Sequence, residues 1–186
     1  MWTNPDHFAR WLPPTGAEMR FSRASITVGG SAVFVMTGAF GTMHGRLDYL
    51  ALDAPHLIVY RQGFADAAGA PARHPMVPTW PMSMLTTVTL TEEAPDRTRV
   101  TVTWLPEEPL TPEELATFIA ERAGMTGGWT GSFDKLEELL ALSHAACLRR
   151  WSPGALPASR PLVLSSSSRS SSSRLIRASS SPRPGP

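Results

Sequence analysis

The stretch Thr98-Arg99-Val100-Thr101-Val102-Thr103-Trp104 alternates polar and apolar side chains along its whole length. Successive side chains of a β-strand point to opposite faces, so the two valines and the tryptophan share one face and the arginine and inner threonines share the other. One buried face and one wet face are typical of an antiparallel sheet that is covered on a single side. This strand therefore predicts a half-covered antiparallel sheet.

The residues upstream of this strand repeat the same kind of pattern. Residues 82–90 are rich in Thr, Val, Leu and Met and are followed by the charged turn 92–96, which predicts a hairpin. Two earlier hairpins are predicted, one from residues 18–28 and 31–37 around Gly29-Gly30, and one from residues 45–52 and 56–61 around Asp53-Ala54-Pro55. Residues 62–80 lack periodicity and are rich in Gly, Ala and Pro, so we expect a long connection across the surface or over a cavity mouth.

Helical signals lie at the two ends of this strand-rich region. Asn4-Pro5-Asp6 predicts the start of a short helix that Pro13-Pro14 stops. Thr111-Pro112-Glu113-Glu114 predicts a second start, with a capping threonine and acids at the positive end of the helix dipole. We expect a break between helices at residues 124–128, Gly-Met-Thr-Gly-Gly. A final helix follows, on which Trp129, Phe133, Leu136 and Leu140 form one apolar stripe.

Several function classes are excluded or disfavoured by the residues themselves. The sequence has no run of 18 apolar residues and no basic-then-apolar leader after Met1, so we predict a cytoplasmic protein without a membrane partner. A single cysteine, Cys147, excludes an intrachain disulfide and a Cys-based zinc site. Five scattered histidines show no metal-ligand spacing, and no Gly-x-Ser-x-Gly elbow or phosphate loop occurs. We therefore predict no catalytic residues, no metal and no cofactor.

The charge is unevenly distributed along the chain. Seven of the 17 basic residues lie in residues 149–186, which hold no acid, so residues 1–148 carry ten basic and 16 acidic residues and a net charge of −6. Long runs of Ser, Arg and Pro offer little apolar surface to offset the entropy of ordering. We predict a folded domain over residues 1–145 and a disordered tail over residues 146–186. The tail's arginines could contact phosphates of nucleic acid, but an unstructured appendage is the reading we favour.

An ordered set of short motifs resembles one known superfamily. Trp2-Thr3-Asn4-Pro5 with Trp11 is similar to its "W-T-x-P-x-x-x-x-x-W" segment, and Pro55-His56-Leu57-Ile58-Val59-Tyr60 to its "P-x-x-L-V-Y" strand. Further matches are residues 86–92, and Gly124-Met125, Gly128-Trp129 and residues 132–136, which resemble "GM…GW…SLDKL" with Phe133 in place of leucine. Over residues 2–141 the chain resembles the START-like SRPBCC superfamily. Its branch is the Aha type, similar to the C-terminal domain of activators of the ninety-kilodalton heat-shock protein ATPase.

The resemblance implies an α+β helix-grip fold, in which a curved antiparallel sheet wraps around a long C-terminal helix. Such folds enclose a cavity, and we expect a small apolar molecule there as the binding partner. The predicted ligand-binding residues are inward-facing on the expected sheet and last helix: Phe21, Phe34, Tyr49, Tyr60, Met84, Trp104, Met125, Trp129 and Phe133. For any single one of these residues, filling the core is the reading we favour, and Trp129, at the glycine-rich start of the last helix, is the favoured cavity wall. Arg61 or Asp48 could add a polar contact, although an exposed strand face explains both residues as well.

The resemblance leaves the function open among three classes. We predict a small-ligand-binding or stress-related domain, with an enzyme less favoured. The alternatives are a co-chaperone-like protein-interaction module, or an enzyme of the cyclase or dehydratase kind, which would need an acid–base pair in the cavity. Members of the superfamily carry a further strand upstream of the first motif, so we expect a natural start upstream of Met1 or a bare sheet edge. A bare edge would allow pairing with a second copy of the chain.

Overall fold

The computed structural model describes residues 1–95, 97–151 and 171–177, with side chains described as far as residue 143. Its strands form one antiparallel sheet in the order β1-β2-β3-β4-β6-β7-β8, with the two-residue β5 paired to β4 outside this order. The strands are β1 Glu18–Ala24, β2 Ser31–Gly38, β3 Gly41–Asp53, β4 Leu57–Ala65, β5 Pro71–Ala72, β6 Met84–Ala94, β7 Arg97–Pro106 and β8 Ser171–Arg177.

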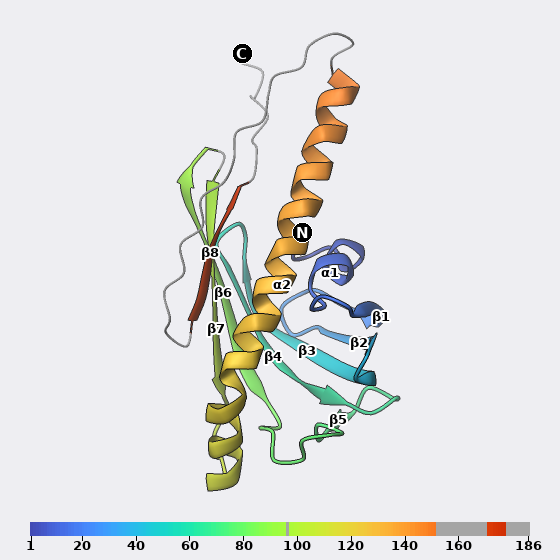
Figure 1. The fold of residues 1–186 in the computed structure, drawn as a ribbon, viewed down its shortest axis with the longest axis vertical. Helices are drawn as coiled ribbons and strands as arrows, with labels where there is room; N and C mark the ends of the chain where they lie inside the picture. Colours follow the sequence, from blue (N-terminus) through green and yellow to red (C-terminus); the bar gives the residue numbers. More distant parts are fainter. Residues whose placement is uncertain (96, 152–170, 178–186) are drawn as a thin grey trace.

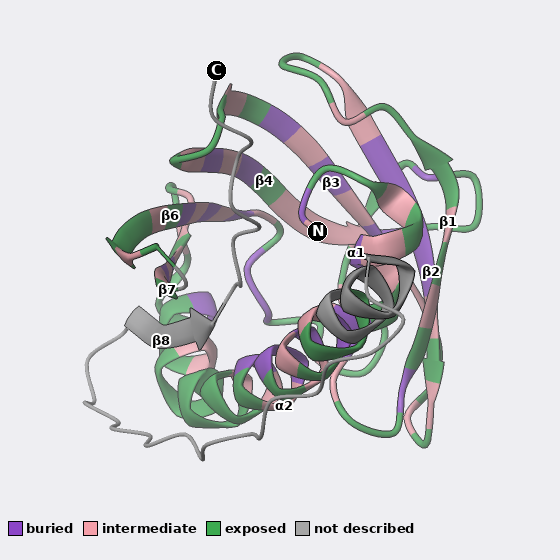
Figure 2. Ribbon diagram, turned by 90° about the horizontal axis from the view of Figure 1, so that it is seen from above, coloured by how far each residue is buried: buried purple, intermediate pink, exposed green. Residues whose placement is uncertain are grey.

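The sheet curves around a single long helix, α2, which spans Pro112–Trp151 (Figure 1). Viewed from above, the strands form an open ring, and α2 lies across its opening with the short helix α1, Pro5–Trp11, beside it (Figure 2). This arrangement is an α+β helix-grip fold, as the sequence predicted. It follows from the alternating strands, since one apolar face of the sheet must be covered and the apolar stripe of α2 covers it.

Helix α1 starts and packs as its sequence indicates. The Asn4 side chain caps the helix by accepting a hydrogen bond from the backbone N–H of His7 at 3.1 Å, and Pro5 occupies the first turn. Phe8 and Trp11 are buried, and the indole N–H of Trp11 donates to the Met1 carbonyl at 3.3 Å. The apolar face of this short helix therefore closes one end of the core.

Helix α2 begins with a capping box. The backbone N–H of Glu114 donates to the Thr111 hydroxyl at 3.2 Å, and the Glu114 carboxylate accepts from the backbone N–H of Thr111 at 2.9 Å. Together with its hydrogen bond to Arg73, this second contact holds the pKa of Glu114 below its usual value.

The predicted break at residues 124–128 is wrong, because α2 continues through all three glycines. Each glycine costs about 1 kcal/mol relative to alanine in a helix. Burial of Trp129, Phe133 and Leu136, which follow the glycines on α2, contributes about 1.5–3 kcal/mol per side chain, which outweighs that cost. Tertiary burial thus overrides a local preference for a break.

The strands differ from the predicted ones mainly in length. Strand β1 ends at Ala24, and the chain then loops through residues 25–30, with Gly29 at a φ of +78° and hydrogen bonds from the loop to Tyr49. Strands β3, β4 and β6 extend beyond their predicted ends, because hairpin partners continue the ladder past the most apolar residues. The three predicted hairpins are all present.

Part of the predicted disordered tail is described. Residues 146–151 continue α2, and residues 171–177 form β8, which pairs with β7 in antiparallel register from Arg97↔Arg177 to Thr103↔Ser171. The remainder of the tail prediction, residues 152–170 and 178–186, lies outside the described residues. The β7 edge of the sheet is thus paired along residues 97–103.

Candidate functional site

A cavity of about 180 Å³ lies between α2 and the concave face of the sheet, with one side open to solvent. The sheet contributes side chains from β2, β3, β4 and β7, and α2 contributes residues from about two turns, 125–132. The described residues that line it are Leu12, Pro14, Phe34, Met36, Leu47, Gln62, Trp104, Met125, Gly128, Trp129 and Ser132. None of these side chains is ionisable, so the cavity is apolar with a few uncharged polar groups.

The distance between α2 and the sheet is set by contacts with the turn after α1. The Ser132 hydroxyl donates to the Leu12 carbonyl at 2.6 Å, and Gly131 allows Thr15 to approach the helix closely. The Lys135 ammonium donates to three backbone carbonyls, those of Pro13 at 3.0 Å, Pro14 at 3.1 Å and Ala17 at 3.4 Å. These bonds fix the middle of α2 and thereby the depth of the cavity.

A glycine opposite Phe34 shapes the cavity wall on β2 and β3. Phe34 and Gly45 are direct partners in the sheet, and the Phe34 ring lies over the glycine. A Cβ atom on Gly45 would lie 2.1 Å from the ring's Cζ atom, far inside van der Waals contact. The absent side chain therefore allows the ring to lie flat against β3 and to form a wall.

Aromatic rings form the opposite wall. Trp104 on β7 meets Trp129 on α2 edge to face at 6.5 Å between centroids, and Trp129 contacts Phe133 at 5.6 Å. Trp2 stacks on Trp129 at 6.5 Å from the α1 side. Large rings with few rotatable bonds give a rigid wall at low entropic cost.

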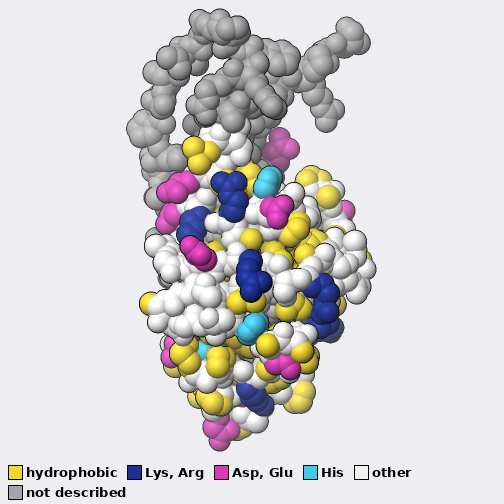
Figure 3. Space-filling view, turned by 90° about the vertical axis from the view of Figure 1, so that its right-hand side faces the viewer, with side chains coloured by type: hydrophobic (Ala, Val, Ile, Leu, Met, Phe, Trp, Pro, Cys, Tyr) yellow, Lys and Arg dark blue, Asp and Glu magenta, His cyan; other side chains and the backbone are white. Residues whose placement is uncertain are grey.

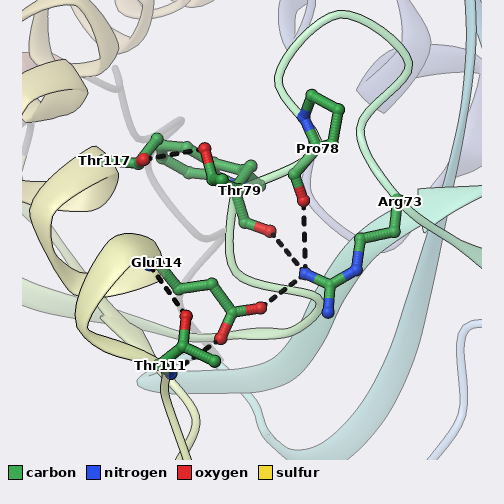
Figure 4. Close-up of polar contacts among 7 residues, drawn as sticks. Arg73, Pro78, Thr79, Thr111, Glu114 and Thr117 are labelled. Atoms are coloured by element: carbon green, nitrogen blue, oxygen red, sulfur yellow. Dashed lines mark hydrogen bonds and ion pairs between the residues drawn. The ribbon is translucent and has the colours of Figure 1, made fainter.

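A segment that we call the strap, residues 73–83, joins this wall to the start of α2. Trp80 is buried between Trp104 and Phe118, with centroids 6.3 and 6.0 Å away. The Arg73 guanidinium donates to the carbonyls of Pro78 and Trp80 and pairs with Glu114 at 2.5 Å, while Thr117 and Thr79 hydrogen-bond at 2.9 Å (Figure 4). The long connection thus covers the outer side of the Trp104 wall.

The strap also contains a histidine held in its neutral form. The His74 Nδ1 accepts hydrogen bonds from the backbone N–H groups of Met76 and Val77, at 3.1 and 3.2 Å, and its ring packs on Phe64 at 4.3 Å. Burial lowers the pKa of His74. This imidazole shapes the strap turn and is not among the cavity-lining side chains.

A row of polar groups crosses the concave face next to the cavity. Tyr49, Tyr60, Thr86 and Trp104 are direct neighbours on β3, β4, β6 and β7. The polar atom of each side chain is buried and has no hydrogen-bond partner among the described residues. Burial raises the pKa of both tyrosines. At Tyr60 the nearby Thr86 hydroxyl acts in the opposite direction and lowers the pKa, although the two hydroxyls do not meet hydrogen-bond geometry.

The structure brings four of the nine predicted ligand-binding residues to the cavity: Phe34, Trp104, Met125 and Trp129. Tyr49, Tyr60, Met84 and Phe133 are at most 2% exposed and fill the core beside it, and Phe21 packs between Phe8 and Phe34. Ligand binding by these residues stays a prediction.

Seven lining residues were missed, namely Leu12, Pro14, Met36, Leu47, Gln62, Gly128 and Ser132. Met36, Leu47 and Gln62 continue the inward alternation of Phe34, Tyr49 and Tyr60, so strand periodicity could have found them. Arg61 and Asp48 lie on the other face, where Arg61 pairs with Glu107 at 2.8 Å and Asp48 with Arg46 at 2.7 Å. The exposed-face explanation of these two residues is therefore correct.

The described residues contain no group of three or more His, Cys, Asp or Glu side chains that could hold a metal ion. Within this part of the chain, no helix is long and apolar enough to cross a membrane. On the face shown in Figure 3, the described acidic, basic and hydrophobic side chains are interspersed, so neither sign of charge forms a continuous patch there.

Comparison with known families identifies the family of this chain. The family model described as "Activator of Hsp90 ATPase homolog 1-like protein" matches residues 1–141. The chain belongs to this family. The match covers nearly the same residues as the sequence motifs, and it confirms the predicted START-like SRPBCC resemblance.

Solved structures of other proteins have a similar fold. A solution structure of a protein from Arthrobacter aurescens is 28% identical, with a TM-score of 0.57 and coverage of 72% of this chain and 71% of that one. A protein from Staphylococcus epidermidis is 26% identical, with a TM-score of 0.54 and coverage of 75% and 80%. A crystal structure from Mycobacterium smegmatis is 21% identical, with a TM-score of 0.59 and coverage of 75% and 78%. A search of functionally curated proteins found no match.

Proposed function

We propose that this family member binds a small hydrophobic molecule in the cavity between α2 and the sheet. The observation that carries the proposal is the lining itself, which is apolar except for Gln62, Trp104 and Ser132 and contains no charged side chain among the described residues. Closed apolar cavities of about 150 Å³ in proteins hold benzene. A cavity of about 180 Å³ suits a molecule built on one substituted ring.

A protein-interaction function is the second candidate. The family description names activators of the Hsp90 ATPase. On α2, Leu115 and Ile119 are 46% and 49% exposed and lie one helical turn apart, which gives a small apolar surface outside the cavity. A cyclase- or dehydratase-like enzyme receives less support, because the described lining offers no carboxylate or imidazole to move a proton.

The test uses the full chain and a matched pair of glycine variants. Gly128 lines the cavity and Gly127 lies next to it on the exposed side of α2, and a Cβ on either would meet nothing within 4 Å. Both Gly128→Leu and Gly127→Leu improve helix propensity by similar amounts. Only the first places a side chain in the cavity.

Native mass spectrometry of the purified full chain, followed by extraction, should release a stoichiometric apolar molecule. Gly127→Leu should retain this molecule, and Gly128→Leu should lose at least 90% of it while melting at or above the wild-type temperature. Equal retention by both variants would contradict binding in this cavity. A folded but empty wild-type chain that also takes up no added ethylbenzene would favour the interaction function.

A further inference from the structure

The strap contacts residues of both cavity walls. On one side, the His74 ring packs on Phe64, with ring centroids 4.3 Å apart. Phe64 lies on β4 in the same row of the concave face as Phe34 on β2, with one β3 residue between them. On the other side, Trp80 packs on Trp104 at 6.3 Å between centroids. The strap therefore connects the wall that contains Phe34 to the wall that contains Trp104.

The turn at the start of the strap depends on an unprotonated nitrogen. The His74 Nδ1 accepts hydrogen bonds from the backbone N–H groups of Met76 and Val77, at 3.1 and 3.2 Å. A neutral imidazole has one acceptor nitrogen, and a protonated imidazole has none. Protonation of Nδ1 would place an N–H group where two donors need an acceptor, so both hydrogen bonds would be lost.

A second attachment of the strap does not depend on this histidine. The Arg73 guanidinium donates to the carbonyls of Pro78 and Trp80 and pairs with Glu114 on α2 at 2.5 Å. Hydrogen bonds from the Thr111 backbone and from Arg73 hold the pKa of Glu114 below its ordinary value of 4.5. This ion pair therefore stays intact over the range in which an imidazole gains its proton.

The described charged groups on the neighbouring elements are engaged elsewhere or face away. Asp66, on the turn after β4, accepts from two backbone N–H groups of its own turn at 2.9 Å. His44 and Arg46 lie on β3 on either side of the residue opposite Phe64, so they point to the other face of the sheet. Burial lowers the pKa of His74 below the ordinary 6.5, so the closed turn resists protonation more than an open one does.

We propose that the strap is a pH-sensitive switch in which protonation of His74 Nδ1 releases the turn 74–77 from Phe64, while Arg73 keeps the strap attached to α2. The open turn binds the proton more readily than the closed turn, so the closed form loses stability as the pH falls below about 6.5. Faster entry and release of a ligand in mild acid would follow. That consequence rests on the proposed function, whereas release of the turn does not.

An NMR titration of the ¹⁵N-labelled full chain without ligand, from about pH 7.5 to about pH 5, tests the switch. The amide proton resonances of Met76 and Val77 should move upfield as their hydrogen bonds break. Their midpoint should coincide with that of the His74 ring and lie below pH 6.5. Amide resonances that stay in place while the His74 ring titrates would overturn the proposal.

Three histidine variants separate the switch from general effects of acid. In His74→Asn, the side-chain oxygen can accept from the same turn and does not titrate, so both amides should keep their downfield positions at about pH 5. His74→Phe keeps a ring but has no acceptor, so both amides should lie upfield at every pH. His56→Asn, at an exposed histidine between β3 and β4, should leave the transition unchanged. A transition that persists in His74→Asn would contradict the assignment.

The link to the cavity is tested with ethylbenzene as the probe. Its exchange rate, measured by NMR, should rise about five- to tenfold between about pH 7.5 and pH 5.5 in wild type, because an open turn titrates near pH 6.5. The rate should stay constant in His74→Asn. A constant rate in wild type while the amides move would overturn the link and leave the switch. A chain that binds no ethylbenzene would count against the proposed function, and the amide titration would still decide the switch.

Discussion

At the residue scale, the polar groups of the concave face define what the interior accepts. The sequence contains two tyrosines, Tyr49 and Tyr60, and both are at most 2% exposed, with ring centroids 5.9 Å apart. Burial disfavours the charged phenolate, so the pKa of both groups is raised above the ordinary value near 10. The folded protein therefore binds two protons that the unfolded chain releases as the pH rises past 10.

This difference predicts the alkaline behaviour of the protein. The two tyrosines should not affect the free energy of unfolding below pH about 10. Above that pH the free energy of unfolding should fall, because the unfolded chain can release the phenol protons and the folded protein cannot. Absorbance at 295 nm should show no phenolate in the folded protein at pH 10. Phenolate should appear together with the loss of circular dichroism, and Tyr49→Phe should halve its amplitude. Gradual ionisation with the fold intact would contradict this.

At the element scale, one ammonium group with three carbonyl partners joins the middle of α2 to the turn after α1. Lys135 is the only lysine in the sequence, and its Nζ bridges α2 to residues 13–17. Hydrogen bonds to charged groups contribute more than neutral ones, and the carbonyls left behind would lose their donor. This attachment holds the helix at a fixed distance from the turn after α1, next to the cavity.

Lys135→Met should therefore lower the free energy of unfolding by about 2 kcal/mol, measured by urea denaturation. Arg122→Met is the matched control, since Arg122 is exposed on the same helix, and its effect should stay within about 0.5 kcal/mol. The Lys135 variant should also bind ethylbenzene more weakly, as the helix is no longer fixed. Equal stability of the two variants would show that the carbonyl contacts contribute little.

At the scale of the whole molecule, the two edges of the sheet are formed by strands from opposite ends of the chain. Strand β1 forms one edge, and β8 pairs along β7 at the other. Without β8, the outer N–H and C=O groups of β7 would be open to pairing with another chain. Closure of this edge is a property of the chain as a whole, because β8 lies 20 residues beyond the end of α2.

A chain ending at Trp151 should thus self-associate through β7. Sedimentation velocity should show a concentration-dependent dimer for the shortened chain and less of it for the full chain. Adding Thr103→Lys to the shortened chain should reduce the dimer, since charges on an edge strand oppose pairing. A shortened chain that stays monomeric across the concentration range would mean that β8 is not needed to protect the edge.

The sequence by itself determined the local architecture and the family. Alternation in residues 98–104, the Asn4 and Thr111 caps and the ordered motifs sufficed, because each depends on neighbouring residues alone. Tertiary structure decided the continuity of α2, whose glycines cost less than the burial of Trp129 and Phe133 contributes. It also decided that Trp104 lines the cavity while Tyr60 fills the core, because this depends on how far α2 lies from the sheet. That distance is set by hydrogen bonds between residues that are 118 to 122 positions apart in the sequence.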